Sequence, residues 1–194
     1  MSIIRKSKTF CVVPFVSQMV DTSGTINLCC VATDHVLKDT DGKNFHVSKD
    51  KMNNVWNSKH MQIYRKFMID GKKLPNCQGC YKSEELGKTS TRQLMNAEWN
   101  DKLGSRGVRQ RVIEALKNDY QLDDSRPVYL DLRLGNICNL KCRMCNPYNS
   151  KAIGSEHSEL LEKDFNYRMV YLREYGDTAE FMKTMTNWYE SDLF

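Results

Sequence analysis

Short apolar runs at the start of the chain predict a β-hairpin. Residues 9–16 and 24–31 are both rich in apolar side chains, a composition typical of short strands. Residues 21–24 between them, Asp-Thr-Ser-Gly, are typical of a turn. Pairing of the two runs would bring Cys11 and Cys29 close together.

From Asn53 the apolar positions change to a helical spacing. Steps of three and four residues predict an amphipathic helix that Gly71 ends. Such a stripe is more often core than a substrate platform. The stripe consists of Val55, Trp56, Met61, Tyr64, Phe67 and Met68.

Two more helices are predicted between residues 83 and 120. The first starts at Glu84 and Glu85, where acidic residues suit a helix N-terminus, and continues to about Asn100. Gly104 and Gly107 break the pattern. In the second helix we expect an apolar face and a solvated basic face, formed by Val108, Val112, Ala115 and Leu116 and by Arg109, Arg111 and Lys117, respectively.

Residues 128–134 alternate as a strand does. Apolar residues occupy the even positions, so Asp131 and Arg133 share the other face. That face either points into an active-site cavity at the carboxyl end of a barrel strand or makes an ordinary pairing with a neighbouring strand or helix. A helix is predicted over residues 150–161, and a helical tail over 165–194.

The composition is that of a soluble globular protein. Hydrophobic residues make up 40% and charged residues 27%, and the net charge is +5. No apolar run approaches the length of a membrane span, and no secretory leader is recognisable, so we expect a cytoplasmic protein. In that compartment the eight cysteines are metal ligands rather than disulfides.

Three cysteines follow the predicted strand within eight residues: Cys138, Cys142 and Cys145. Their C-x3-C-x2-C spacing resembles the signature of the radical S-adenosylmethionine (radical SAM) enzymes; the alternatives are a zinc knuckle or three unrelated buried thiols. The resemblance implies a [4Fe–4S] cluster with one open iron that binds S-adenosylmethionine, and it places Met144 against the adenine of that cofactor.

The other cysteines also have a recognisable spacing. Cys11, Gly24-x4-Cys29 and the pair Cys77-x2-Cys80 resemble the SPASM/twitch auxiliary-cluster domain of radical SAM enzymes. By that resemblance Cys11, Cys29, Cys77 and Cys80 ligate a second [4Fe–4S] cluster, although four thiolates also suit zinc. Cys30 is interpreted as a buried small residue, with an alternative role as ligand.

These patterns predict an α+β, helix-rich fold. It would comprise a twitch-type hairpin and helix module over residues 1–82, a helical connection over 83–126, and the first βα unit of a radical SAM barrel over 127–194. Only 49 residues follow Cys145, whereas a complete barrel of this kind has ~250 residues. We therefore expect a truncated or split product that cleaves S-adenosylmethionine weakly at most by itself.

The resemblance implies a parent activity, the reductive cleavage of S-adenosylmethionine to a 5′-deoxyadenosyl radical. That radical would abstract hydrogen from a peptide, sugar or nucleotide-like substrate. Expected partners are an electron donor and a second chain that supplies the rest of the barrel. The alternative is a non-catalytic iron–sulfur or zinc-binding partner protein. A nucleic-acid-binding module is not supported, because basic patches interleaved with aromatic residues are absent from the sequence.

Overall fold

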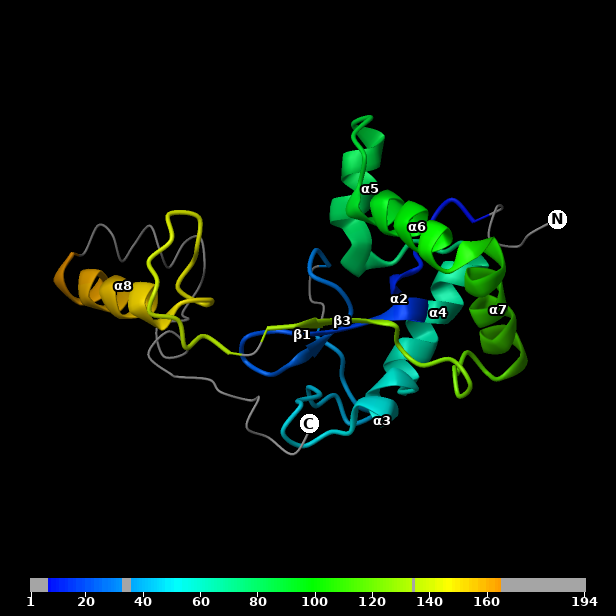
Figure 1. The fold of residues 1–194 in the computed structure, drawn as a ribbon, viewed down its shortest axis with the longest axis horizontal. Coiled ribbons are helices and arrows are strands. Elements are labelled where there is room, and N and C mark those ends of the chain that lie inside the picture. The colour runs from blue at the N-terminus through cyan, green and yellow to red at the C-terminus, as the bar shows by residue number, and fades with distance from the viewer. Residues whose placement is uncertain (1–6, 33–35, 134, 165–194) are drawn as a thin grey trace. The chain divides into compact units, whose positions relative to one another are not determined.

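The computed structural model describes residues 7–32, 36–133 and 135–164 (Figure 1). The chain divides into two compact units. The first lies within Met1–Val20 and Thr25–Leu132, and the second within Asp21–Gly24 and Arg133–Phe194. Helices predominate and one small sheet accompanies them, so the predicted α+β, helix-rich class is confirmed.

The sheet of the first unit has three strands in the order β2-β1-β3. They are β1 (Ser17–Val20), β2 (Ile26–Asn27) and β3 (Tyr129–Leu132). β1 pairs antiparallel with β2 and parallel with β3. The strand predicted over 128–134 is therefore confirmed as β3, while its last apolar position, Leu134, lies outside the described residues.

The predicted hairpin is shorter than expected, and its first strand is misplaced. Val13–Val16 forms a short helix, α2, whose four residues are all buried, and β1 begins directly after it. Pro14 lies in the first turn of α2, where a missing N–H costs nothing. A short apolar run cannot by itself distinguish a buried strand from a buried helix, which is why the prediction of a strand over 9–16 was wrong.

The helix predicted from Asn53 is present as two helices. They are α3 (Met52–Trp56) and α4 (Lys59–Asp70), divided where Ser58 caps α4 by accepting a hydrogen bond from Met61 N at 3.4 Å. Gly71 ends α4 with a φ of +73°, a left-handed conformation that glycine adopts without strain. The predicted end of the helix is confirmed.

The helix predicted from Glu84 to about Asn100 is largely present, but its predicted start is wrong. These acidic residues end α5 (Gln78–Glu85), which follows a 3-10 turn over Pro75–Cys77. Ser90 then starts α6 (Thr91–Lys102) through a capping box with Gln93, in which each side chain satisfies a backbone N–H of the other residue. The next helix, α7, spans Gly104–Lys117 and includes Gly107, so this glycine does not break it.

The apolar face predicted for α7 is largely buried, but one basic residue departs from prediction. Val108, Val112 and Ala115 are at most 4% exposed. Arg111 was assigned to a solvated face, yet its guanidinium donates to the Phe15 carbonyl at 2.9 Å and to the Arg126 carbonyl at 2.8 Å. The Arg111 side chain of α7 therefore satisfies a backbone carbonyl near the end of α2.

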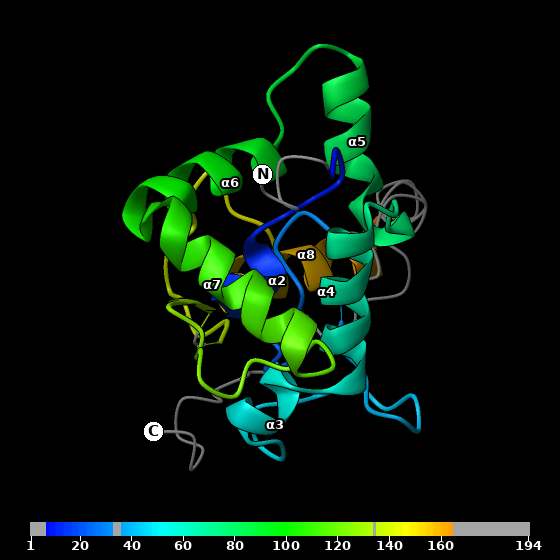
Figure 2. The same cartoon turned by 90° about the vertical axis from the view of Figure 1, so that its right-hand side faces the viewer.

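The core of the first unit surrounds α2, which contacts α4, α6 and α7 (Figures 1 and 2). The stripe on α3 and α4 is core, as predicted: its members apart from Phe67 are at most 3% exposed. Within the described residues, no helix is long and apolar enough to cross a membrane.

The second unit contains α8 (Lys151–Lys163), which confirms the helix predicted over 150–161. Ser150 caps it by accepting a hydrogen bond from Ile153 N at 3.4 Å. The tail predicted to be helical, 165–194, lies outside the described residues.

Candidate metal centre

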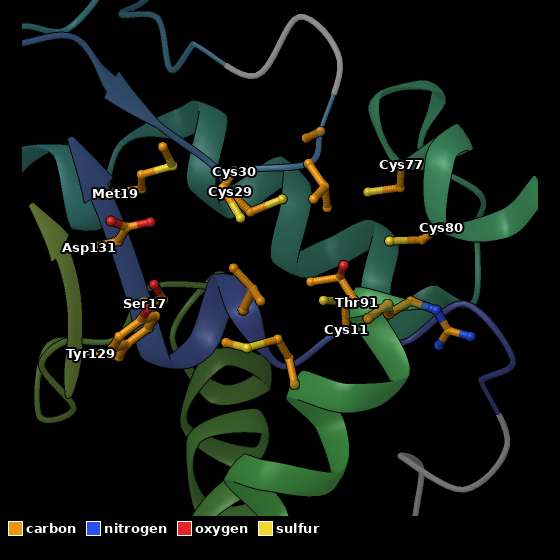
Figure 3. A pocket seen from close by; sticks show the side chains of 15 residues that line it. Cys11, Ser17, Met19, Cys29, Cys30, Cys77, Cys80, Thr91, Tyr129 and Asp131 are labelled. Carbon is orange, nitrogen blue, oxygen red and sulfur yellow. The ribbon is translucent and has the colours of Figure 1, made fainter. Parts of the chain in front are cut away.

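Four cysteines from three separate segments line one cavity of about 80 Å³ in the first unit (Figure 3). We refer to them as the N-terminal cysteines: Cys11, Cys29, Cys77 and Cys80. The sequence predicted this set as ligands of one centre. The structure places all four on the same cavity; which of them bind a metal stays a prediction.

Two of these thiols are positioned by one turn of the chain. Cys77 is the last residue of the 3-10 turn, where its N–H donates to the Leu74 carbonyl at 3.0 Å. The helix α5 begins at Gln78, directly after Cys77, and Cys80 lies in its first turn. The buried Tyr81 holds the start of this segment, since its hydroxyl accepts a hydrogen bond from Leu74 N at 3.3 Å.

Cys11 is held by its backbone neighbours. On one side, Asn96 of α6 donates to the Phe10 carbonyl at 2.9 Å, and on the other it accepts from Val12 N at 2.8 Å. Arg92 of the same helix also donates to the Phe10 carbonyl, at 2.6 Å. Because α6 fixes the backbone on both sides, the Cys11 side chain has a defined direction into the cavity (Figure 3).

Burial is the main influence on the pKa values of three N-terminal cysteines, Cys11, Cys29 and Cys77. It raises the pKa of Cys11 and of Cys29 above the ordinary thiol range. Burial also raises the pKa of Cys77, to about 12, with smaller contributions from Cys29 and Cys80, while the charge of Arg92 opposes the rise. Without a metal these groups are therefore neutral thiols at physiological pH, and binding a metal would release their protons.

Cys30 was interpreted as a buried small residue, which is wrong: its side chain is exposed. It nevertheless contributes to the lining of the same cavity. The two adjacent cysteines differ in exposure, since Cys29 is half-buried and Cys30 is exposed. Within the described residues, no three His, Cys, Asp or Glu side chains lie close enough to hold a single metal ion; the thiols surround a cavity rather than a point.

Strands β1 and β3 form another wall of the cavity. Ser17 and Met19 line it from β1, and Tyr129 and Asp131 line it from β3 (Figure 3). The parallel register pairs Ser17 with Tyr129 and Met19 with Asp131. Asp131 thus lines the cavity of the N-terminal cysteines, while the active-site cavity of a barrel strand expected for Asp131 and Arg133 stays a prediction. On the neighbouring positions, Val128 and Leu130 are each 47% exposed.

The C-terminal cysteines, Cys138, Cys142 and Cys145, lie in a loop of the second unit before α8. Cys145 N donates to the Cys142 carbonyl at 2.9 Å. The thiol of Cys142 is exposed and the other two are half-buried. Met144, the predicted neighbour of the adenine, is 99% exposed. The structure places these residues in one short loop and leaves their role as ligands a prediction.

Buried polar residues organise this loop. The Ser150 hydroxyl donates to the Leu140 carbonyl at 2.8 Å, and Lys151 N donates to the Asn136 carbonyl at 2.9 Å. Both Asn136 and Ser150 are fully buried. The loop is therefore closed at its base, where it enters and where α8 begins.

Sequence reasoning missed the contribution of α6. Thr91, Arg92 and Met95 line the cysteine cavity, yet the residues from 83 to 126 were interpreted as a connection. Their spacing places them on one helical face, but the same spacing occurs in any amphipathic helix. No signal in the sequence distinguishes a cavity-lining face from one that packs on a core.

Comparison with known families gives one match. Residues 11–81 match the family model of SPASM, described as an iron-sulfur cluster-binding domain. This segment begins at Cys11 and includes Cys29, Cys77 and Cys80. No curated protein and no solved structure matches the chain. Residues 11–81 are thus similar to a domain that occurs in radical SAM proteins.

Proposed function

We propose that this chain is a radical SAM-type iron–sulfur protein with two cluster sites. The observation that carries the proposal is the convergence of the N-terminal cysteines on one cavity, within the segment that matches an iron–sulfur cluster-binding domain. Thiolates are the protein ligands that iron–sulfur clusters take. The donor set therefore fits a [4Fe–4S] cluster with one cysteine for each iron.

The N-terminal site has the role of an electron carrier in this proposal. Four cysteine ligands leave no iron free for a substrate, which favours transfer of an electron over direct substrate binding. The hydrogen bonds that fix the segments of Cys11 and of Cys77 and Cys80 would hold these ligands still. Rigid ligands keep the reorganisation that accompanies a change of charge small.

The C-terminal cysteines hold the second cluster in the same proposal, with one open iron for S-adenosylmethionine and Met144 beside the adenine. When bound, this second cluster would supply the electron that cleaves the sulfonium of S-adenosylmethionine and so forms the 5′-deoxyadenosyl radical. The chain's own contribution is the loop itself, which Ser150 and Asn136 close at its base. The substrate class is a peptide, sugar or nucleotide-like molecule. The further partner is an electron donor, and the protein works in the cytoplasm.

Metal and sulfide analysis after anaerobic reconstitution tests this proposal. We expect about eight irons per chain, with matching sulfide, since each [4Fe–4S] site holds four. Replacing Cys138, Cys142 and Cys145 by alanine should remove about half of the iron and abolish any change that S-adenosylmethionine causes in the electron paramagnetic resonance (EPR) spectrum of the reduced protein.

The alternative is a non-catalytic partner protein with iron–sulfur or zinc at the N-terminal site alone. It predicts about four irons, or zinc without sulfide, and no loss of metal in the C-terminal triple variant. Zinc without sulfide in the reconstituted wild-type chain contradicts the radical SAM proposal.

A further inference from the structure

Arg92 connects the two segments that carry three of the N-terminal cysteines. It is the second residue of α6 and lies outside the matched residues 11–81. Its Nη1 donates to the Phe10 carbonyl at 2.6 Å, next to Cys11. Its Nε and Nη2 donate to the two carboxylate oxygens of Glu84 at 3.0 and 2.5 Å. Glu84 belongs to α5, the helix that carries Cys80.

The ion pair between Arg92 and Glu84 is held in one arrangement. The carboxylate accepts both guanidinium bonds, and it also accepts a hydrogen bond from the Ser90 hydroxyl at 2.5 Å. Only 9% of the Arg92 side chain and 19% of the Glu84 side chain are exposed. A bidentate pair in a shielded setting keeps its geometry better than an exposed one.

The two charges are placed unequally with respect to the cavity. Arg92 lines it together with the N-terminal cysteines, whereas Glu84 is not among its described lining residues. Of the two charged residues, Arg92 is therefore the one that belongs to the cavity wall. A positive charge in a poorly screened wall acts more strongly on such a group than it would in water.

Reduction of a cysteine-ligated cluster adds one negative charge to a site that is already negative. The reduction potential of an iron–sulfur cluster depends on its net charge, on hydrogen bonds and on its exposure to solvent. A fixed cation in the wall stabilises the reduced form more than the oxidised form. A fixed anion behind it has the opposite effect.

We propose that Arg92 is a positioning residue for the N-terminal cluster and that its charge, opposed by Glu84, raises the reduction potential of that cluster. The inference rests on the proposed function, because it needs an iron–sulfur cluster between the N-terminal cysteines. By this inference α6, which lies outside the matched residues 11–81, contributes to electron transfer by the N-terminal cluster.

The test is a redox titration of the full chain carrying Ala at Cys138, Cys142 and Cys145, so that only the N-terminal cluster contributes to the EPR signal. Dithionite supplies the one electron that reduces the cluster, and ferricyanide removes it. In this background we expect Arg92→Gln to lower the midpoint potential and Glu84→Gln to raise it. Arg92→Lys, which keeps the charge, should stay closer to the parent protein than Arg92→Gln does.

Shifts of the midpoint potential in opposite directions in Arg92→Gln and Glu84→Gln distinguish a charge effect from loss of structure. A merely structural role would move the potentials of Arg92→Gln and Glu84→Gln in the same direction or leave them unchanged, and either result overturns the inference while the proposed cluster stands. If Arg92→Gln does not retain iron, the comparison of Glu84→Gln and Arg92→Lys with the parent decides the same question. A parent protein without iron and sulfide contradicts the proposed function and the inference with it.

Discussion

The guanidinium of Arg65 lies over the indole ring of Trp56, with its central carbon 4.3 Å from the ring centroid. Arg65 is fully buried, and it donates to the carbonyls of Pro14, Trp56 and Tyr120 at 2.9, 2.7 and 3.0 Å. Burial lowers the pKa of Arg65 to about 9. One cation thus satisfies carbonyls from three segments, among them the α2 segment that follows Cys11.

Replacement of Arg65 by methionine should destabilise the first unit. The apolar volume is roughly kept, but the two buried carbonyls of Pro14 and Trp56 and the partly buried carbonyl of Tyr120 lose their donor, and an unsatisfied buried acceptor costs about 1–3 kcal/mol. We expect the free energy of unfolding to fall by about 3 kcal/mol, as measured by urea denaturation of the metal-free chain. Arg109→Met on α7 is the matched control, because Arg109 is exposed; equal losses in both variants would contradict the role of Arg65.

Cys29 and Cys30 offer a comparison between adjacent thiols. Both line the cavity, but Cys29 is half-buried and Cys30 is exposed. We expect Cys29→Ala to lose about four irons per chain, those of one cluster, and Cys30→Ala to keep them. Iron and sulfide analysis after reconstitution measures both, and loss of iron in Cys30→Ala alone would make Cys30 the ligand in place of Cys29.

Ser150 should control the order of the C-terminal cysteine loop. Its buried hydroxyl donates to the Leu140 carbonyl and caps α8. Ser150→Ala removes both interactions, at a local cost of about 1–2 kcal/mol. Amide hydrogen exchange over residues 136–150 should become faster, whereas Ser155→Ala, at an exposed position of the same helix, should leave it unchanged. Unaltered exchange in Ser150→Ala would show that other contacts close the loop.

The lowered pKa of Glu84 predicts that the stability of the fold depends on pH in the acidic range. Burial raises the pKa of this carboxyl, but the hydrogen bonds from Arg92 and Ser90 and the charges of Arg92 and Lys73 outweigh it, so that the pKa lies below its ordinary value. A carboxyl with a lowered folded pKa stabilises the fold above its unfolded pKa of ~4.3, and this stabilisation is lost as the pH falls through the folded value.

The measurement is urea denaturation of the metal-free chain at several pH values below 5, the range set by the carboxyl pKa of ~4.3. Glu84→Gln should show a smaller decrease in stability on acidification than the wild type. Glu98→Gln on α6 is the control, since Glu98 makes an exposed pair with Lys102. If the stability of the wild type and of Glu84→Gln depends on pH in the same way, Glu84 does not contribute to that dependence.

The sequence by itself determined the elements that local spacing encodes. The stripe from Val55 to Met68, the end of α4 at Gly71, the alternation in β3 and the helix after Ser150 depend on residues within a turn or two of one another. The spacing of the N-terminal cysteines also predicted them as one set, because a domain signature is a pattern of separations along the chain.

Only the tertiary structure decided what depends on distant neighbours. Whether the run around Pro14 is a strand or a helix follows from its burial among α4, α6 and α7, because either form satisfies an apolar run. The role of Arg92 depends on partners at Phe10 and Glu84, of which Phe10 is 82 residues away along the chain. Side-chain periodicity reports only which face of an element is apolar, so a charged residue that bridges two ligand-bearing segments becomes visible only when those segments are packed together.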